Sequence, residues 1–272
     1  MPRYGLPKLI ATDLDGTLVR SDDTVSAYTH EVLHRIRRAG IPVVGATGRG
    51  PRLAELTRND IRAADFLVMA GGGRVIDQSS TGEPVVLRDE RLSGEALAKV
   101  LTALETEVGP LSVMVEALDG HNDPLWGDLD PAWPYPERVV FRTRDDCCSV
   151  DVIKAFARSP RHDVDELLAV AQRVIPPALA TITQAGLGFI EICPPGTDKA
   201  SGLAVIARSL GIDPGDVLVF GDMPNDLPMF EWAGWRRVAV SNAHATVRAA
   251  ADEVTLRNDD DGVAVWLDRL LS

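Results

Sequence analysis

The chain has 272 residues, a length typical of two domains rather than of one compact core. Apolar residues make up 45% of the sequence and charged residues 25%, which is the ordinary globular composition and excludes disordered and fibrous classes. Acidic residues outnumber basic ones 40 to 28, and the net charge of −12 disfavours nonspecific binding to nucleic acid or to anionic membranes. If the substrate is an anion, positive charge has to be supplied locally, by a metal ion or by a few lysine and arginine side chains.

The sequence carries no strong targeting or redox signal. No apolar run approaches the ~20 residues that a membrane-spanning helix needs, and the apolar stretch near the N-terminus is too short for a secretory signal. The three cysteines are an odd number, and two of them, Cys147 and Cys148, are adjacent. This pattern suits neither a disulfide framework nor a metal site. We therefore expect a soluble cytoplasmic protein with reduced thiols.

The two ends of the chain alternate strands and helices. Near the N-terminus we expect a strand at 8–12, a helix at about 25–39, a strand at 41–46, a helix at about 50–59 and a strand at 66–70. Near the C-terminus we expect a helix at about 198–210, a strand at 216–220, a short helix, a strand at 237–240 and a last helix after Gly262. This alternation is typical of a parallel α/β sheet.

The middle of the chain has a different pattern. Two helices, at 93–107 and 164–174, lie among several strands of alternating polarity, and the proline-rich stretch 124–136 has the composition of a loop. This pattern indicates an α+β domain inserted into the α/β domain. We predict an α/β core domain of residues 1–83 and 190–272 and an inserted domain of residues 84–189.

Two carboxylates directly follow the first expected strand. The sequence there is Asp13-Leu14-Asp15-Gly16-Thr17, and a spacing of two residues can place both acidic side chains on one side of the chain. Neighbouring carboxylates can hold a divalent cation, or divide the roles of nucleophile and acid–base catalyst. Gly16 permits a sharp turn. The alternative is a turn whose acidic residues only cap a helix.

Two further polar groups stand at the starts of expected helices. Thr47-Gly48-Arg49 follows a strand and precedes a helix, so that its hydroxyl and backbone N–H groups favour an anion, although a plain N-cap explains them too. Lys199 opens the helix after the loop PPGTD, where the macrodipole disfavours a cation. A lysine in this place indicates an external anionic partner, with a solvated surface lysine as the alternative.

A last cluster follows the strand expected at 216–220. Its sequence is Gly221-Asp222-Met223-Pro224-Asn225-Asp226. Three of the four clusters thus lie at the carboxyl ends of expected parallel strands, and the fourth opens a helix expected to pack on the same sheet. Open α/β sheets bind their ligands at this edge.

In this order, the motifs DLDGT, TGR, a single downstream lysine and GDxxND resemble those of the haloacid dehalogenase superfamily of phosphohydrolases. The size and position of the insertion are similar to those of the Cof-type sugar-phosphate phosphatases, whose large α+β cap follows the second motif. The resemblance covers nearly the whole chain, including Ser241-Asn242-Ala243 near the C-terminus. It departs at Gly71-Gly72, where many relatives have Asn-Gly. The fold that it implies is a Rossmann-like parallel-sheet core with an inserted cap.

The resemblance also implies a mechanism. Asp13 is expected to be the nucleophile that forms an aspartyl-phosphate, and Asp15 to protonate the leaving alcohol and then activate water. Mg²⁺ is the expected cofactor, held by the Asp13 side chain, the Asp15 carbonyl and Asp222. The residues expected to bind phosphate or substrate are Thr47, Gly48, Arg49, Lys199 and Asn225. Asp226 is expected to orient Lys199 or the metal shell.

The function predicted in this way is Mg²⁺-dependent hydrolysis of a small phosphomonoester, a sugar or polyol phosphate. The expected partner is a small phosphorylated metabolite. A phosphomutase of the phosphomannomutase type is the alternative within the superfamily. A non-catalytic binding or regulatory protein on the same fold is the alternative of another class, but loss of Asp13 or Asp15 would be its mark, and both are present.

A competing metal motif lies on the first expected helix. His30-Glu31-Val32-Leu33-His34 matches the HExxH pattern of zinc proteases, in which two histidines bind the metal and the glutamate acts as base. Its surroundings are arginine-rich and no third ligand is evident in the sequence. We interpret this helix as a solvated one.

Overall fold

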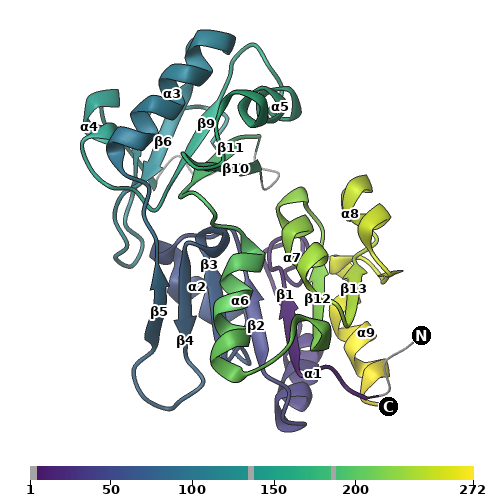
Figure 1. Ribbon diagram of the computed structural model, residues 1–272. Helices are drawn as coiled ribbons and strands as arrows, with labels where there is room; N and C mark the ends of the chain where they lie inside the picture. Colours follow the sequence, from purple (N-terminus) through teal and green to yellow (C-terminus); the bar gives the residue numbers. More distant parts are fainter. Residues whose placement is uncertain (1–4, 134–137, 185–187) are drawn as a thin grey trace. The chain divides into compact units, whose positions relative to one another are not determined.

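The computed structural model describes residues 5–133, 138–184 and 188–272. The chain divides into two compact units, which are shown in Figure 1 and described in turn. Unit 1 comprises residues 1–47, 55–88 and 198–272, and unit 2 comprises residues 48–54 and 89–197.

Unit 1 is built on an eight-stranded sheet with the strand order β14-β13-β12-β1-β2-β3-β4-β5. Neighbouring strands from β14 to β3 run parallel, and β4 runs antiparallel to β3. The strands are β1 (Leu9–Thr12), β2 (Val43–Ala46), β3 (Phe66–Met69), β4 (Arg74–Asp77), β5 (Val85–Asp89), β12 (Val217–Gly221), β13 (Arg236–Ala239) and β14 (Glu253–Val254). All residues of β1, β2, β3 and β12 are buried, as expected of central strands covered on both faces.

Helices cover this sheet, with α6 in front of it in Figure 1. The helices of unit 1 are α1 (Ala27–Arg38), α2 (Ala54–Asp60), α6 (Lys199–Leu210), α7 (Leu227–Trp232), α8 (Ala245–Ala250) and α9 (Gly262–Leu270), with 3₁₀ turns η2 (Ala70–Gly72), η4 (Pro214–Asp216), η5 (Pro224–Asp226) and η6 (Asn258–Asp260). Ser26 caps α1 by accepting a hydrogen bond from the backbone N–H of Thr29. Asp198 caps α6 in a capping box with Ser201, so the sequence itself fixes where α6 begins.

Unit 2 contains a six-stranded sheet with the order β10-β11-β9-β6-β7-β8, in which only β7 and β8 are paired in parallel. Its elements are η1 (Pro51–Leu53), α3 (Gly94–Val108), β6 (Ser112–Glu116), β7 (Leu125–Gly127), β8 (Val139–Phe141), α4 (Arg144–Cys148), β9 (Lys154–Arg158), α5 (Val164–Val174), β10 (Thr181–Gln184) and β11 (Ile190–Cys193). One face of the sheet packs against α3 and α5 in an apolar core. The other face carries a smaller cluster around Trp133, Phe156 and Phe189.

The structure thus confirms an α/β fold with a parallel-sheet core and an inserted α+β part, but it divides the chain at other residues than expected. Residues 84–88 belong to unit 1 because β5 joins its sheet. Residues 190–197 belong to unit 2 because β11 pairs with β9 and β10. Residues 48–54 also cluster with unit 2, although they lie within the expected core.

Several short elements also differ from those expected. The proline-rich stretch 124–136 is not only a loop, since it contains β7. The short elements β4, β5, β14, α4 and α8 were not expected. Tyr135, Pro136 and Gly186 lie outside the described residues. The three cysteine thiols are free. None of the helices in the described ranges has the length and apolar character needed to cross a membrane.

Candidate active site

Three of the motif residues follow adjacent strands of the unit 1 sheet. β12, β1 and β2 are neighbours and run parallel, so their carboxyl ends lie at one edge. Asp222, Asp13 and Thr47 are the residues that directly follow these strands. Because the chain leaves each strand at this edge, the polar side chains there are held by a rigid, buried scaffold.

A buried lysine joins two of the aspartates. The Nζ atom of Lys199, at the start of α6, donates hydrogen bonds to Oδ1 of Asp13 and to Oδ1 of Asp226, each at 2.5 Å. All three side chains are buried, with Lys199 only 1% exposed. Asp226 is itself fixed, because its Oδ2 accepts from the backbone N–H groups of Asp222 (2.8 Å) and Met223 (3.0 Å).

Asp222 is held by the turn that follows Asp15. Oγ1 of Thr17 donates to Oδ1 of Asp222 at 2.7 Å. Gly16 has a φ of +86°, and a Cβ built there would lie 2.5 Å from Oδ2 of Asp222. Glycine is therefore required at this position both by its backbone conformation and by the close approach of the carboxylate.

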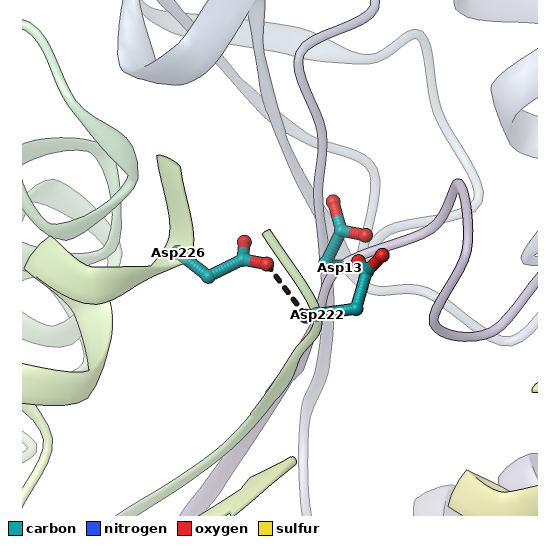
Figure 2. Close-up of side chains that lie close together, drawn as sticks. All are labelled: Asp13, Asp222 and Asp226. Atoms are coloured by element: carbon teal, nitrogen blue, oxygen red, sulfur yellow. Dashed lines mark hydrogen bonds between the residues drawn. The ribbon is translucent and has the colours of Figure 1, made fainter. Parts of the chain in front are cut away.

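The acidic side chains gather around one point. Figure 2 shows the carboxylates of Asp13 and Asp222 close together, with the carboxylate of Asp226 to their left. One carboxylate oxygen from each of the three lies within 4.8 Å of the others, a spacing that can hold a metal ion. Both oxygens of Asp226 already accept hydrogen bonds, from Lys199 and from two backbone amides. The carboxylates best placed to bind a cation are therefore those of Asp13 and Asp222.

This crowding shifts the pKa values of the cluster. Burial, together with the nearby charges of Asp226 and Asp222, raises the pKa of Asp13 well above its ordinary value, although Lys199 lowers it. Burial and the charge of Asp226 raise the pKa of Asp222 to about 6. Burial alone would lower the pKa of Lys199, but the carboxylates of Asp13 and Asp226 raise it, so the ammonium group stays charged. The cluster is electrostatically suited to take up a cation.

The remaining expected residues differ in their surroundings. Asp15 is exposed at the turn after β1. Thr47 is fully buried, and its backbone is tied to β3 and to Gly71 through hydrogen bonds with Val68 and Gly71. Oδ1 of Asn225 is buried and has no hydrogen-bond partner among the described residues.

Gly48 and Arg49 fall in unit 2, unlike the other expected residues. The carbonyl of Gly48 accepts a hydrogen bond from Lys154 at 2.5 Å. Arg49 is half-buried. The structure therefore divides the TGR motif between the two units, directly after Thr47.

A family model for haloacid dehalogenase-like hydrolases matches residues 10–267, which is nearly the whole chain. The chain belongs to the haloacid dehalogenase-like hydrolases. Within this family its curated relatives include many phosphatases, and the chain is a phosphoric monoester hydrolase of the Cof type. The family expected from the DLDGT, TGR, lysine and GDxxND motifs is confirmed.

Individual relatives align over most of their length. The chain is 29% identical to the 5-amino-6-(5-phospho-D-ribitylamino)uracil phosphatase YwtE of Bacillus subtilis, covering 97% of this chain and 98% of that protein. It is 29% identical to the HMP-PP phosphatase of Cronobacter sakazakii, covering 84% of this chain and 82% of that protein. Among solved structures, a haloacid dehalogenase-like hydrolase from Bacteroides thetaiotaomicron superposes with a TM-score of 0.73 at 30% identity, covering 97% of this chain and 99% of that one.

The hydrolase has supporting contacts that sequence reasoning missed. Nδ2 of Asn242 donates to the carbonyl of Gly16 (2.8 Å), and Oδ1 of Asn242 accepts from the backbone N–H of Asn258 (3.0 Å). The backbone N–H of His244 donates to the carbonyl of Asp222 (2.7 Å). These residues follow β13, the next parallel strand, so their position after a strand was the signal that could have found them.

The HExxH motif does not form a metal site. Glu31 is exposed and pairs with Arg38 at 2.7 Å. The cluster of potential metal ligands found among the described residues contains neither His30 nor His34. The apolar side of α1 is formed instead by Val32, Leu33 and Ile36, which are buried. Glu31 and His34 are exposed as interpreted from the sequence, whereas His30 is half-buried and its Nδ1 has no hydrogen-bond partner among the described residues.

Proposed function

We propose that this hydrolase is a Mg²⁺-dependent phosphatase that cleaves a small phosphomonoester, a sugar or polyol phosphate, through an aspartyl-phosphate on Asp13. The observation that carries the proposal is the buried contact of Asp13 with Lys199, beside Asp222 and at the carboxyl end of β1. This places a carboxylate nucleophile next to a permanent positive charge. Transfer of a phosphoryl group needs both a nucleophile and a positive charge that stabilises its oxygens.

The charge of the site argues for a metal. The carboxylates of Asp13, Asp222 and Asp226 lie close together with one ammonium group, that of Lys199, and the whole chain carries a net charge of −12. A phosphate dianion would be repelled by such a site unless a cation is bound there. Mg²⁺ suits the site because it takes a few oxygen ligands, retains water and binds substrate phosphate.

The residues present fit this ion. Repulsion by neighbouring carboxylates is among the causes of the raised pKa values, from Asp226 and Asp222 on Asp13 and from Asp226 on Asp222, and a divalent cation would relieve it. The buried Oδ1 of Asn225 is an acceptor suited to a metal-bound water or a protonated phosphoryl oxygen. Asp13, Asp222 and the backbone carbonyl of Asp15 would hold the ion. When bound, it would neutralise charge on the transferring phosphoryl group.

The first half of the reaction uses Asp13 and Asp15. A carboxylate oxygen of Asp13 attacks phosphorus, and the bond from phosphorus to the alcohol oxygen breaks. Asp15 gives its proton to that oxygen, so the alcohol leaves neutral. Lys199 holds a phosphoryl oxygen and is itself oriented by Asp226, while the hydroxyl of Thr47 binds another.

The second half reverses the role of Asp15. Its carboxylate removes a proton from water, whose oxygen attacks phosphorus, and the bond between phosphorus and Asp13 breaks. Inorganic phosphate leaves and Asp13 is a carboxylate again. Asp15 is suited to both steps because it is exposed, so it can meet the alcohol first and water afterwards.

The substrate class is supported by the relatives. The name of YwtE specifies a phosphorylated ribityl chain, which is a polyol phosphate. The proteins YcsE and YitU of Bacillus subtilis carry the same activity in their names, at 25% and 27% identity. A phosphomutase would use the same aspartate chemistry but return the phosphoryl group to a sugar, and none of the relatives named above suggests it.

Chelation tests the proposal. We expect EDTA to abolish hydrolysis of p-nitrophenyl phosphate and added Mg²⁺ to restore it. Full activity in the chelator would exclude the metal, and restoration by Zn²⁺ alone would favour the HExxH motif. A screen of phosphate release over sugar phosphates, polyol phosphates and nucleotides then tests the substrate class, which a preference for nucleotides would contradict.

A further inference from the structure

A buried ionic cluster lies on the sheet of unit 2, away from α3 and α5. Glu116 at the end of β6 stands directly opposite Lys154 at the start of β9, and Glu191 of β11 is adjacent. These three residues are at most 3% exposed. Arg52 of η1, also buried, completes a set of two cations and two anions.

The charged side chain of Lys154 binds the backbone of another segment. Its Nζ donates to Oε1 of Glu191 and to the carbonyl of Gly48, each at 2.5 Å, and lies 4.5 Å from the ring centroid of Phe156. Apolar residues of similar size would be no less stable at a buried position. The contact that the ammonium group makes outside the sheet is the hydrogen bond that it donates to Gly48.

Glu116 holds the same segment further along. Its Oε1 accepts from the backbone N–H of Arg52 at 3.4 Å, and its Oε2 lies 3.9 Å from Nε of Arg52. A Cβ at Gly50 would overlap the carboxylate of Glu116, so a larger residue there would require the segment or the Glu116 side chain to move. Residues 48–54 are thus held at two points by the ends of β6 and β9.

The held segment begins immediately after Thr47. Thr47 is tied to the unit 1 sheet by its backbone hydrogen bonds, whereas Gly48 belongs to unit 2. Within unit 2, the carbonyl of Gly48 is held by Lys154.

We propose that Lys154, supported by Glu116 and Glu191, is a positioning residue that fixes the backbone of residues 48–54 and thereby holds the backbone amide of Gly48 in the TGR motif for phosphate binding. The proposal rests on the proposed phosphatase function. It assigns to Lys154 an effect on phosphate binding through the backbone, independent of any contact with the alcohol.

The test uses two variants and a matched control. Lys154→Met combined with Glu191→Gln removes the hydrogen bond to Gly48 without leaving a lone buried charge. Gly50→Ala keeps all four charged groups and displaces the segment from Glu116. The control is Arg158→Met with Asp130→Asn, which removes another ion pair (3.4 Å) of unit 2, formed by the last residue of β9.

Two readouts are needed, one of which does not depend on activity. Hydrogen exchange of the backbone amides of residues 48–53 should accelerate roughly tenfold in both variants, which corresponds to the loss of one hydrogen bond to a charged group. The dissociation constant of inorganic phosphate, measured calorimetrically with Mg²⁺, should rise by a similar factor. The control should change neither quantity.

The outcomes separate this proposal from the proposed function. Unchanged amide exchange in the variants would overturn it, as would faster exchange with an unchanged phosphate affinity. An equal loss of phosphate affinity in the control would show that Lys154 has only a general structural role, and would also overturn the proposal. Failure of the proposed function would be seen in the unsubstituted protein, which would then neither bind phosphate nor hydrolyse p-nitrophenyl phosphate.

Discussion

The surroundings of Asp13 and Asp15 support the division of labour proposed for them. Asp13 is 5% exposed and bonded to Lys199, so its carboxylate is fixed beside a positive charge. Asp15 lies two residues on, after the chain has left the sheet, and is exposed. A fixed nucleophile and a more accessible proton donor are what a two-step phosphoryl transfer requires.

Asp15→Asn should therefore act on proton transfer alone. We expect kcat/KM for an alkyl phosphate, which reflects the steps up to release of the alcohol, to fall by ~10²–10⁴-fold, because the alcohol then leaves without general acid catalysis. The loss should be smaller for p-nitrophenyl phosphate, whose leaving group needs little protonation. Steady-state kinetics on both substrates measure the difference. An equal loss on the two would contradict this role for Asp15.

The raised pKa of Asp222 predicts how Mg²⁺ stabilises the protein at different pH. Below its ordinary pKa the group is protonated in both the folded and the unfolded state. Between that value and about 6 only the folded protein binds the proton, so the metal-free protein loses stability as the pH rises through this window. Mg²⁺ bound at the cluster would compete with that proton and, at higher pH, would relieve the repulsion between the ionised carboxylates.

We accordingly expect Mg²⁺ to raise the melting temperature by several degrees at about pH 7.5 and hardly at all at about pH 5. Thermal unfolding with and without Mg²⁺ measures this, and Asp222→Asn is the control that should remove the effect at both pH values. A shift of equal size at the two pH values would show that Mg²⁺ binds elsewhere.

At the scale of elements, α6 delivers Lys199 to the site. A lysine in the first turn is opposed by the helix dipole, and it is accepted here because Asp13 and Asp226 neutralise it. The start of the helix is fixed by Asp198, whose side chain accepts from the backbone N–H of Ser201 at 2.7 Å. The position of Lys199 thus depends on this cap.

Asp198→Ala should destabilise the protein by about 1 kcal/mol and lower kcat/KM roughly tenfold or more, because Lys199 is no longer held in register. Asp163→Ala is the matched control, since Asp163 caps α5 in an equivalent capping box within unit 2. It should cost similar stability in urea unfolding and leave kcat/KM nearly unchanged. Equal kinetic losses in both variants would contradict the role given to the α6 cap.

The elements also show which features the sequence could predict. The strands β1, β2, β3 and β12 were predictable because each is a continuous apolar run that ends at polar residues. The strand β5 was missed because its side chains are largely exposed, with Val85 55% exposed, so no buried pattern marks it. The strand β7 is only three residues long and lies in a proline-rich stretch.

The candidate site was predictable for a related reason. Its residues directly follow strands, so chain order alone brings Asp13, Thr47 and Asp222 to one edge. The contacts of Asn242 with Gly16 and of Lys154 with Gly48 join segments that are remote in sequence. Asn242 lies in the Ser241-Asn242-Ala243 stretch after a strand and Lys154 belongs to no local pattern, but only the tertiary structure reveals the partner of either residue.

At the scale of the whole molecule, the net negative charge of the chain repels the anionic substrate. A chain with a charge of −12 repels a phosphate dianion before the dianion reaches the local positive charges of the site. Screening should weaken this repulsion, so kcat/KM should rise on the order of two- to threefold between low and physiological ionic strength. The kcat at saturating substrate should stay constant. A fall in kcat/KM with added salt would indicate long-range attraction instead.

The central claim is that Asp13 carries the phosphoryl group, and peptide mapping of the trapped intermediate tests it most directly. The Asp15→Asn variant, incubated with a ³²P-labelled phosphomonoester and quenched in acid, should retain an acid-stable, hydroxylamine-labile label. If Asp13 is the nucleophile, we expect this label on the peptide that contains Asp13, and no label in Asp13→Asn. A label on any other residue, or normal turnover by Asp13→Asn, would contradict it.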